Sequence, residues 1–348
     1  MRFLVLGGTA WLGHRIAATA LERGHDVTCL ARGSAVPDGA ELVVADRDDP
    51  RELPLPAGAR WDVVVDVARQ PGHVRRAVRE LRSRSGRYVF VSTGNVYASQ
   101  SDEGADETAE LLPALVADSF TDPDHYGPAK VACENAVLAA FGSGRSLIAR
   151  AGLIGGPGDP TGRTDYWPRR FARETAGDSI SGGPVLVPDA PELPTALIDV
   201  RDLADWLVRA AEAGTAGVFN AGGTPVPFPA HLDAARAAAR AVTRSTAPTV
   251  VAAERWLLDR GVSEWAGPRS LPLWVSDRSW YGMNARSSAA ARAAGLTVRP
   301  LEDTLRDAAL AHESDSPFPG GAGLTPAHEH DLVVELETAR ESPPAAPQ

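Results

Sequence analysis

Lysine is almost absent from this sequence: its 348 residues contain one lysine, Lys130, and 34 arginines. Basic residues are also outnumbered, because 35 Lys and Arg stand against 45 Asp and Glu and leave a formal net charge of −10. The arginines are spread along the chain and form no block, so the basic surface that nucleic acids require is not indicated. We therefore expect no nucleic-acid partner.

Cysteine, metal-ligand clusters and long apolar runs are scarce as well. The two cysteines, Cys29 and Cys133, have neither a disulfide framework nor metal-ligand spacing, and they suit buried thiols in a reducing cytoplasm. His328 and His330 lie close together, but no nearby histidine or cysteine completes a metal site. No apolar run reaches the roughly 18–20 residues of a membrane span, and no signal peptide precedes the first apolar run. We expect a cytoplasmic protein with neither a metal nor a membrane partner.

The chain does contain enough apolar residues for a large core. Hydrophobic residues make up 44% of it, which allows one nucleotide-binding domain with a smaller domain grafted on it. Its first 31 residues indicate a strand, a glycine turn, a helix and a second strand. The apolar run FLVL at 3–6 leads into GGTAWLG at 7–13, a helix-like stretch follows at 15–23, and the second strand lies at 27–31.

In such a βαβ unit each part of the turn has a physical role. Gly7 permits the tight turn, the helix N-terminus offers unpaired N–H groups to a pyrophosphate, and Gly13 lets the helix pack on the strand. The residues of this turn that we expect at a dinucleotide are Gly7, Thr9, Ala10, Trp11, Leu12 and Gly13.

The lone lysine stands four residues after a tyrosine, in YGPAK at 126–130. On a helix this spacing places Tyr126 and Lys130 on one face, where an ammonium group stabilises phenolate and lowers the tyrosine pKa. Tyr126 can then move protons near neutral pH. An ordinary exposed lysine near a helix start is the other interpretation of the same residues.

Together these motifs resemble the short-chain dehydrogenase/reductase superfamily in its extended, epimerase-like branch, the NAD-dependent epimerase/dehydratase family. That branch begins with GxxGxxG and carries YxxxK, and STGNVY at 92–97 resembles its segment in which a Ser or Thr stands four residues before a Tyr. RAGL at 150–153, GPG at 156–158 and LIDVRDLA at 197–204 add further likeness. The resemblance implies an α/β fold: a Rossmann-type doubly wound parallel sheet with a smaller C-terminal substrate domain.

The resemblance also implies a catalytic set. Tyr126 would exchange a proton with the substrate oxygen, Thr93 would hydrogen-bond the same oxygen, and Lys130 would lower the tyrosine pKa and hold the nicotinamide ribose. Hydride would pass to or from the nicotinamide. A threonine that bonds only its local backbone is the alternative interpretation of Thr93.

The end of the second strand bears on the choice of cofactor. NAD-binding units place an acidic residue there for the ribose hydroxyls, whereas this chain has LARG at 30–33. Arg32 can pair with a 2′-phosphate, so we predict NADP and regard NAD as the less favoured cofactor. A solvated loop arginine is the alternative interpretation of Arg32. The further residues that we expect at the cofactor are Asp46, Ala68, Arg69, Lys130 and Leu153.

Two departures from the family narrow the chemistry. Dehydratases of this branch carry an Asp-Glu pair after the catalytic threonine, where this chain has Gly94 and Asn95, and its epimerases often have asparagine where Leu153 stands. Reduction of a small-molecule carbonyl, or oxidation of the alcohol, needs neither group. We therefore predict an NADP-dependent oxidoreductase. The amino-acid composition indicates a GC-rich bacterial genome, where such enzymes often serve specialised metabolism. An epimerase with tightly held NAD(P) and a non-catalytic nucleotide-binding relative are the alternatives.

Substrate contacts are predicted from position alone. Asn95 follows the catalytic threonine, and a polar and aromatic stretch after the glycine turns supplies Arg163, Tyr166 and Trp167. The segment 101–124 has eight acidic residues and no Lys or Arg, and it indicates either a solvated flap or a contact for a cationic substrate. Four tryptophans within 256–280 either anchor a small core or line an aromatic pocket.

The alternation of strands and helices predicts the domain boundaries. The nucleotide-binding domain takes 1–152 plus about 196–222, the substrate domain takes about 153–195 plus 223–312, and 313–348 forms a weakly ordered tail. Strand or helix character is expected at 332–336 within that tail. The resemblance suggests a homodimer that pairs through the helix of Tyr126 and Lys130.

Overall fold

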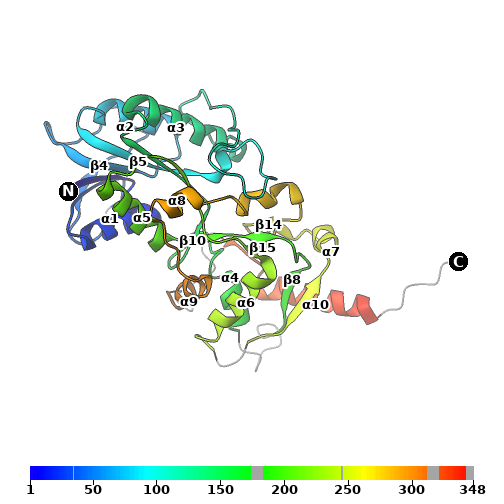
Figure 1. The fold of residues 1–348 in the computed structure, drawn as a ribbon. Helices are drawn as coiled ribbons and strands as arrows, with labels where there is room; N and C mark the ends of the chain where they lie inside the picture. The colour runs from blue at the N-terminus through cyan, green and yellow to red at the C-terminus, as the bar shows by residue number, and fades with distance from the viewer. Residues whose placement is uncertain (34, 174–182, 244–245, 312–320, 342–348) are drawn as a thin grey trace. The chain divides into compact units, whose positions relative to one another are not determined.

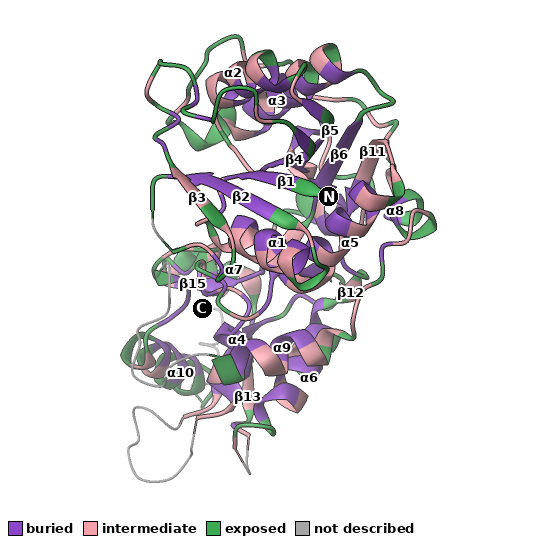
Figure 2. Ribbon diagram, turned by 90° about the vertical axis from the view of Figure 1, so that its left-hand side faces the viewer, coloured by how far each residue is buried: buried purple, intermediate pink, exposed green. Residues whose placement is uncertain are grey.

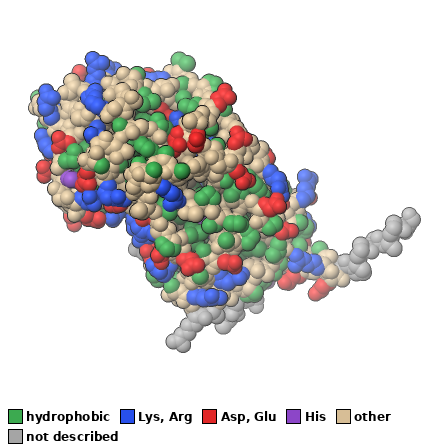
Figure 3. All heavy atoms as spheres, in the orientation of Figure 1, with side chains coloured by type: hydrophobic (Ala, Val, Ile, Leu, Met, Phe, Trp, Pro, Cys, Tyr) green, Lys and Arg blue, Asp and Glu red, His purple; other side chains and the backbone are tan. Residues whose placement is uncertain are grey.

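The computed structural model describes residues 1–33, 35–173, 183–243, 246–311 and 321–341. The chain forms two compact units, of which the first comprises Met1–Ile154, Ala196–Thr224 and Ser279–Val298. The second comprises Gly155–Thr195, Pro225–Arg278 and Arg299–Gln348. Among the described residues, no helix combines the length and the apolar character that crossing a membrane requires. On the face drawn in Figure 3, basic and acidic side chains are interspersed.

A seven-stranded parallel sheet forms the centre of the first unit, in the order β11-β6-β5-β4-β1-β2-β3. Its strands are β1 (Arg2–Leu6), β2 (Asp26–Ala31), β3 (Glu41–Val44), β4 (Trp61–Asp66), β5 (Ser85–Thr93), β6 (Ser146–Ala151) and β11 (Gly217–Ala221). The strand order reverses between β1 and β4, as it does in doubly wound dinucleotide-binding sheets. The predicted α/β fold class is confirmed.

Helices cover both faces of this sheet (Figures 1 and 2). The first face packs against α1 (Trp11–Glu22) and α5 (Val200–Ala213), and the second against α2 (Pro71–Leu81) and α3 (Tyr126–Phe141). In β1, Phe3 and Val5 belong to the first core, whereas Leu4 and Leu6 belong to the second. Because both faces are covered, the strand is apolar without alternation.

The carboxyl ends of the strands meet at one edge of the sheet, since every pair is parallel. The glycine turn follows β1 there, and β5 runs into a short 3-10 helix, η1 (Gly94–Val96). Tyr126 opens α3 directly after a second one, η2 (Pro123–His125). Open α/β sheets bind ligands outside this edge, so the topology brings the sequence motifs to one place.

The second unit is built from shorter elements. Three strand pairs are β8 (Val185–Pro188) with β13 (Thr249–Ala252), β9 (Pro194–Thr195) with β12 (Val226–Pro227), and β14 (Ser263–Trp265) with β15 (Ser270–Pro272). Its helices are α4 (Tyr166–Phe171), α6 (Phe228–Ala239), α7 (Glu254–Asp259), α9 (Leu301–Ala311) and α10 (Pro326–Glu341). One further strand pair joins β7 (Leu153–Gly155) and β10 (Leu197–Asp199).

Within the predicted tail, 326–341 forms the helix α10, which includes the stretch 332–336 where helix or strand character was expected. Its buried residues Leu332, Val333 and Leu336 recur at helical spacing, and this gives α10 an apolar face. The buried Glu329 accepts a hydrogen bond of 2.9 Å from the Leu186 backbone N–H and pairs with Arg170. Residues 312–320 and 342–348, which the tail prediction also covers, lie outside the described residues.

The segment Ser279–Val298, which was predicted within the smaller domain, belongs to the first unit. This segment carries η3 (Arg278–Asn284) and α8 (Ala289–Ala293), and α8 packs against β11. Of the tryptophans of 256–280, Trp280 lies in the first unit and the other three lie in the second.

Gly13 provides a test of the close packing between α1 and the turn. A Cβ added there would lie 2.2 Å from the Gly7 carbonyl oxygen. We expect Gly13→Ala to lower the free energy of unfolding by about 1–3 kcal/mol in urea denaturation. Gly144→Ala is the control, because its added Cβ meets nothing within 4 Å, and it should stay within about 0.5 kcal/mol of the parent. Equal stability of the two variants would contradict this account.

Candidate functional site

The glycine turn leaves room for an anion at the start of α1. Gly7 has a φ of 100°, which favours glycine. The N-terminus of α1 has neither a side-chain cap nor an acidic residue in its first turn, so its positive end is open to a phosphate. Gly13 brings this turn of the helix against the Gly7 carbonyl, as the 2.2 Å approach of an added Cβ shows.

A cavity of about 200 Å³ lies beside this turn. It is lined by Leu6, Gly7, Thr9, Ala10, Leu30, Ala31, Arg32, Ala45, Asp46, Arg47, Val67, Ala68 and His73. Six of these residues were predicted at the cofactor, namely Gly7, Thr9, Ala10, Arg32, Asp46 and Ala68. Residues from the ends of β1 and β2 thus share one cavity with residues that follow β3 and β4, as a dinucleotide site requires.

A buried carboxylate holds Arg47, one of the residues that line this cavity. Asp66, at the end of β4, accepts two hydrogen bonds from Arg47, at 2.7 and 2.9 Å, and a third from the Tyr88 hydroxyl at 2.6 Å. Burial opposes ionisation, but the Arg47 guanidinium holds the pKa of Asp66 below its usual range. The charge of Arg47 is therefore neutralised within the protein and is not available to a ligand phosphate.

Arg32 is the arginine of this cavity that remains available. Its side chain is 74% exposed, and its Nη1 lies 3.9 Å from a carboxylate oxygen of Asp48. The same carboxylate is 2.7 Å from Nε2 of His73. An exposed ion pair of this length is weak, so the guanidinium can turn from Asp48 to a phosphate at little cost.

Thr93 and Tyr126 meet at the same edge of the sheet. Thr93 ends β5, and its hydroxyl accepts a hydrogen bond of 3.2 Å from the Asn95 backbone N–H. The phenol of Tyr126 lies near enough to that hydroxyl for the hydroxyl to lower the pKa of the phenol. Burial raises the pKa of Tyr126, while the charge of Arg69 and the Thr93 hydroxyl lower it in part. The two side chains can therefore act on one substrate oxygen.

Lys130 bonds the protein backbone. It is buried, and its ammonium donates hydrogen bonds to the carbonyl oxygens of Ala68, at 2.8 Å, and Val91, at 2.6 Å. Burial lowers its pKa to about 8. The cation that lowers the pKa of Tyr126 is Arg69, whose guanidinium lies 5.1 Å from the centre of the phenol ring. Two backbone carbonyls hold the Lys130 ammonium, and its effect on the tyrosine pKa stays a prediction.

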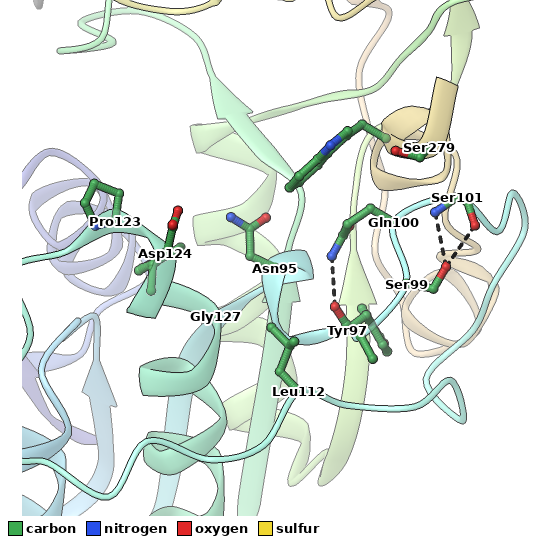
Figure 4. Close-up of a pocket in the computed structure, with 13 residues that line it drawn as sticks. Asn95, Tyr97, Ser99, Gln100, Ser101, Leu112, Pro123, Asp124, Gly127 and Ser279 are labelled. Atoms are coloured by element: carbon green, nitrogen blue, oxygen red, sulfur yellow. Dashed lines mark hydrogen bonds between the residues drawn. The ribbon is translucent and has the colours of Figure 1, made fainter. Parts of the chain in front are cut away.

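A second and larger cavity, of about 590 Å³, opens beside Tyr126. It is lined by Asn95, Tyr97, Ala98, Ser99, Gln100, Ser101, Leu112, Pro123, Asp124, Tyr126, Gly127, Ser279 and Trp280. Figure 4 shows the side chains of Asn95 and Asp124 pointing into it from η1 and η2. The cavity is large enough for a small organic molecule and contains the proton-transfer candidate.

Several known proteins are similar to this chain in sequence or in fold. No family model matches the chain. A 3-diazoavenalumate denitrifying reductase from a Streptomyces species is 28% identical over 247 residues, which cover 63% of this chain and 75% of that protein. A UDP-glucuronic acid 4-epimerase from Bacillus cereus, solved with NAD, has a TM-score of 0.58 and 14% identity and covers 97% of this chain and 99% of its own. A UDP-N-acetylglucosamine 4-epimerase from the same species has a TM-score of 0.59 and 16% identity over 91% and 99%.

The chain has the fold of the epimerase-like short-chain dehydrogenases/reductases. In this epimerase-like fold Trp11 and Leu12 lie in the first turn of α1, and Leu153 opens β7 directly after the sheet strand β6. Their contacts with a cofactor, and that of Arg69, stay predictions.

Three predicted substrate residues lie in the second unit of the epimerase-like fold. Tyr166 and Trp167 are fully buried there. The Trp167 indole donates to the Pro272 carbonyl at 2.9 Å, and the Tyr166 hydroxyl accepts from the Leu324 backbone N–H at 3.3 Å. These contacts give both residues a packing role. Arg163 lies 5.2 Å from the centre of the Trp265 ring. A substrate role for the three stays a prediction.

The residues that line the two cavities and that the sequence analysis did not assign to the site include Arg47, His73, Asp124 and Trp280. Arg47 stands next to the predicted Asp46, so its position was a usable signal. Trp280 was named only as one member of a tryptophan-rich stretch. Of the eight acids at 101–124, Asp124 lines the cavity, and Glu107 accepts a hydrogen bond of 2.6 Å from the Asn220 backbone. In the described part of the chain, no three His, Cys, Asp or Glu side chains gather as a metal site requires.

The role of Arg69 can be tested by titrating the phenol. Loss of a nearby positive charge destabilises phenolate, so Arg69→Gln should raise the pKa of Tyr126 above that of the parent protein. Absorbance difference titration against Tyr126→Phe isolates this tyrosine from the other four. Arg75→Gln is the control, because its guanidinium binds the 115–118 segment. A larger rise in Lys130→Met than in Arg69→Gln would support the role of the lysine predicted from the sequence.

Proposed function

We propose that this chain is an NADP-dependent oxidoreductase that reduces a carbonyl group of a small molecule, or oxidises the corresponding alcohol. The observation that carries the proposal is the meeting of Thr93 and Tyr126 beside a cavity of about 590 Å³ at the carboxyl edge of a dinucleotide-type sheet. A phenol with a second hydroxyl beside it can transfer a proton to a substrate oxygen and hydrogen-bond that oxygen, and ligands of open α/β sheets bind at this edge.

In this proposal, side chains of the protein carry out the proton transfer that accompanies hydride transfer. In the reductive direction the Tyr126 phenol gives its proton to the carbonyl oxygen while the carbonyl carbon gains a hydride. The Thr93 hydroxyl donates a hydrogen bond to the same oxygen and stabilises the negative charge that develops on it. Arg69 favours the resulting phenolate until Tyr126 is reprotonated. The nicotinamide, when bound, supplies the hydride and is oxidised.

Lys130 supports this reaction through the backbone. Its ammonium holds the Ala68 carbonyl, beside the cofactor cavity, and the Val91 carbonyl, two residues before Thr93. The fit to a dinucleotide rests on the positive φ of Gly7 and the uncapped start of α1. Arg32, with its side chain 74% exposed at the end of β2, favours NADP over NAD because it can pair with a 2′-phosphate.

A second candidate function is epimerisation with a retained nucleotide, which the names of the structural neighbours favour. The Streptomyces relative, which is named a 3-diazoavenalumate denitrifying reductase, instead favours net reduction. Net change of nicotinamide absorbance during turnover separates the two, because an epimerase regenerates its cofactor in every cycle. A non-catalytic nucleotide-binding relative would show no turnover at all.

Cofactor choice is the first prediction of this proposal. NADPH should bind at least tenfold more tightly than NADH, a difference of about 1.4 kcal/mol, when each is titrated by calorimetry. Arg32→Ala should remove that preference because the 2′-phosphate loses its cation. Arg51→Ala, another exposed arginine, which binds Asp49, serves as the control and should retain it. Equal affinity for both nucleotides in the parent protein would contradict NADP specificity.

Tyr126→Phe tests the chemistry itself. Without the phenolic proton, we expect the rate of hydride transfer to fall by about 10²–10⁴-fold, the usual contribution of general acid catalysis. NADPH affinity should change little, since the ring remains. Stopped-flow absorbance of the nicotinamide measures the first quantity and calorimetry the second. Unchanged turnover in Tyr126→Phe would falsify both the oxidoreductase and the epimerase candidates.

A further inference from the structure

Trp280 is an exposed large apolar residue. Trp280 is 45% exposed, and it is the one tryptophan among the large exposed apolar residues of the described chain. The indole lines the cavity that contains Tyr126. An indole left in contact with water beside a cavity can stack on an incoming ring and bury apolar surface.

The backbone that carries Trp280 is held firmly. Gly282, two residues later, packs so closely on the neighbouring loop that an added Cβ would lie 2.6 Å from the Asp102 backbone nitrogen. The Gly104 backbone N–H donates to the Ala285 carbonyl at 2.8 Å. η3 and the loop after η1 therefore form one wall of the cavity, and Trp280 is not a side chain on a free loop.

Arg286 stabilises the same wall through hydrogen bonds and a contact with an aromatic ring. Its Nη2 donates to the Ser99 carbonyl at 2.8 Å and to Oε1 of Gln100 at 2.9 Å, and its guanidinium lies 4.0 Å from the centre of the Tyr97 ring. Gln100 also donates to the Tyr97 carbonyl at 3.0 Å. Both ends of the Gln100 amide are therefore engaged within the protein, and Gln100 belongs to the wall.

Two polar side chains of the cavity are not engaged in this way. In the part of the chain that the structure describes, the Asn95 amide and the Asp124 carboxylate make no hydrogen bond or ion pair of their own. Both point into the cavity in Figure 4. Asp124 is also the one residue of the cavity lining with a formal charge at neutral pH. A ligand thus meets an indole face, an amide, one carboxylate and the Tyr126 phenol.

We infer that the cavity takes an aromatic carbonyl compound, with its ring stacked on Trp280, its carbonyl at Tyr126 and Thr93, and a hydrogen-bond donor on the ring facing Asp124. This inference rests on the proposed function and specifies its substrate class. The carboxylate selects against a negative charge on that side of the ring by repulsion. The wall held by Gly282 and Arg286 keeps the stacking surface in place before the substrate binds.

A matched pair of substrates tests the ring. Benzaldehyde and cyclohexanecarbaldehyde have a similar size, and only the first has a flat ring. The parent protein with NADPH should show the higher kcat/KM for benzaldehyde, and Trp280→Ala should lower that value about tenfold, through KM, while the saturated aldehyde changes less than threefold. Trp280→Phe keeps a ring and should retain most of the preference. Trp256→Ala, a tryptophan outside the cavity lining, is the control and should leave both values unchanged.

Binding without turnover separates this inference from the proposed function. Benzyl alcohol and cyclohexylmethanol are titrated by calorimetry into the parent protein and Trp280→Ala, with and without NADP⁺. Tighter binding of benzyl alcohol that Trp280→Ala abolishes supports the inference even if no aldehyde is reduced, in which case the proposed function fails alone. Equal binding of the two alcohols by the parent, or an aromatic preference that survives in Trp280→Ala, overturns the inference.

Asp124 is tested in the same assay. The anion 4-(hydroxymethyl)benzoate should bind the parent protein at least threefold more weakly than benzyl alcohol, and Asp124→Asn should narrow that difference. Glu103→Gln, an exposed acid of the same segment that does not line the cavity, should leave it unchanged. If the parent binds the anion as tightly as benzyl alcohol, the orientation toward Asp124 is wrong.

Discussion

The buried ammonium of Lys130 ties together the parts of this protein on which the candidate site depends. It bonds the Ala68 carbonyl after β4 and the Val91 carbonyl near the end of β5, and it projects from α3, the helix that Tyr126 opens. One cation therefore sets the spacing between the cofactor cavity, Thr93 and the phenol. A compact ammonium with three donors fits between two carbonyl oxygens, whereas the broad planar guanidinium of arginine would force them apart. This requirement accounts for the single lysine in a chain that otherwise uses arginine.

Behind the site, buried charges are arranged in compensated pairs. Arg47 is neutralised by Asp66, and Arg150 forms an ion pair of 2.8 Å with Glu134 while donating to the Tyr97 hydroxyl at 2.9 Å. Removing one partner from such a pair leaves an unpaired buried charge, so these residues hold the framework in one arrangement. Among the charged groups at the two cavities or beside the phenol, Arg32, Arg69 and Asp124 are exposed.

The cations of Lys130 and Arg69 take different positions relative to Tyr126. Lys130 lies four residues after Tyr126, on the same face of the helix. Its ammonium nevertheless bonds the two carbonyls near the strand ends. Arg69, carried by the segment after β4, then faces the phenol ring at 5.1 Å. Gln70 fixes that segment by exchanging hydrogen bonds of 3.0 Å with the Phe120 backbone. The carbonyl contacts near the sheet edge and the cation nearest the phenol ring thus come from different residues.

Local sequence was sufficient for the parts that depend on short-range geometry. The apolar run at 3–6 and the glycines at 7 and 13 predicted the strand, turn and helix, because burial on both faces and close packing restrict those positions to few residue types. The sequence identified Lys130 as a candidate site residue, but it did not identify the hydrogen-bond partners of its ammonium. Both partners are backbone carbonyls that are distant from Lys130 along the chain. The same limit applies to Trp280, whose segment returns to the first unit after more than fifty residues of the second. Helical and strand periods are encoded locally, whereas the neighbours of a side chain at the sheet edge are chosen by the crossovers of the tertiary fold.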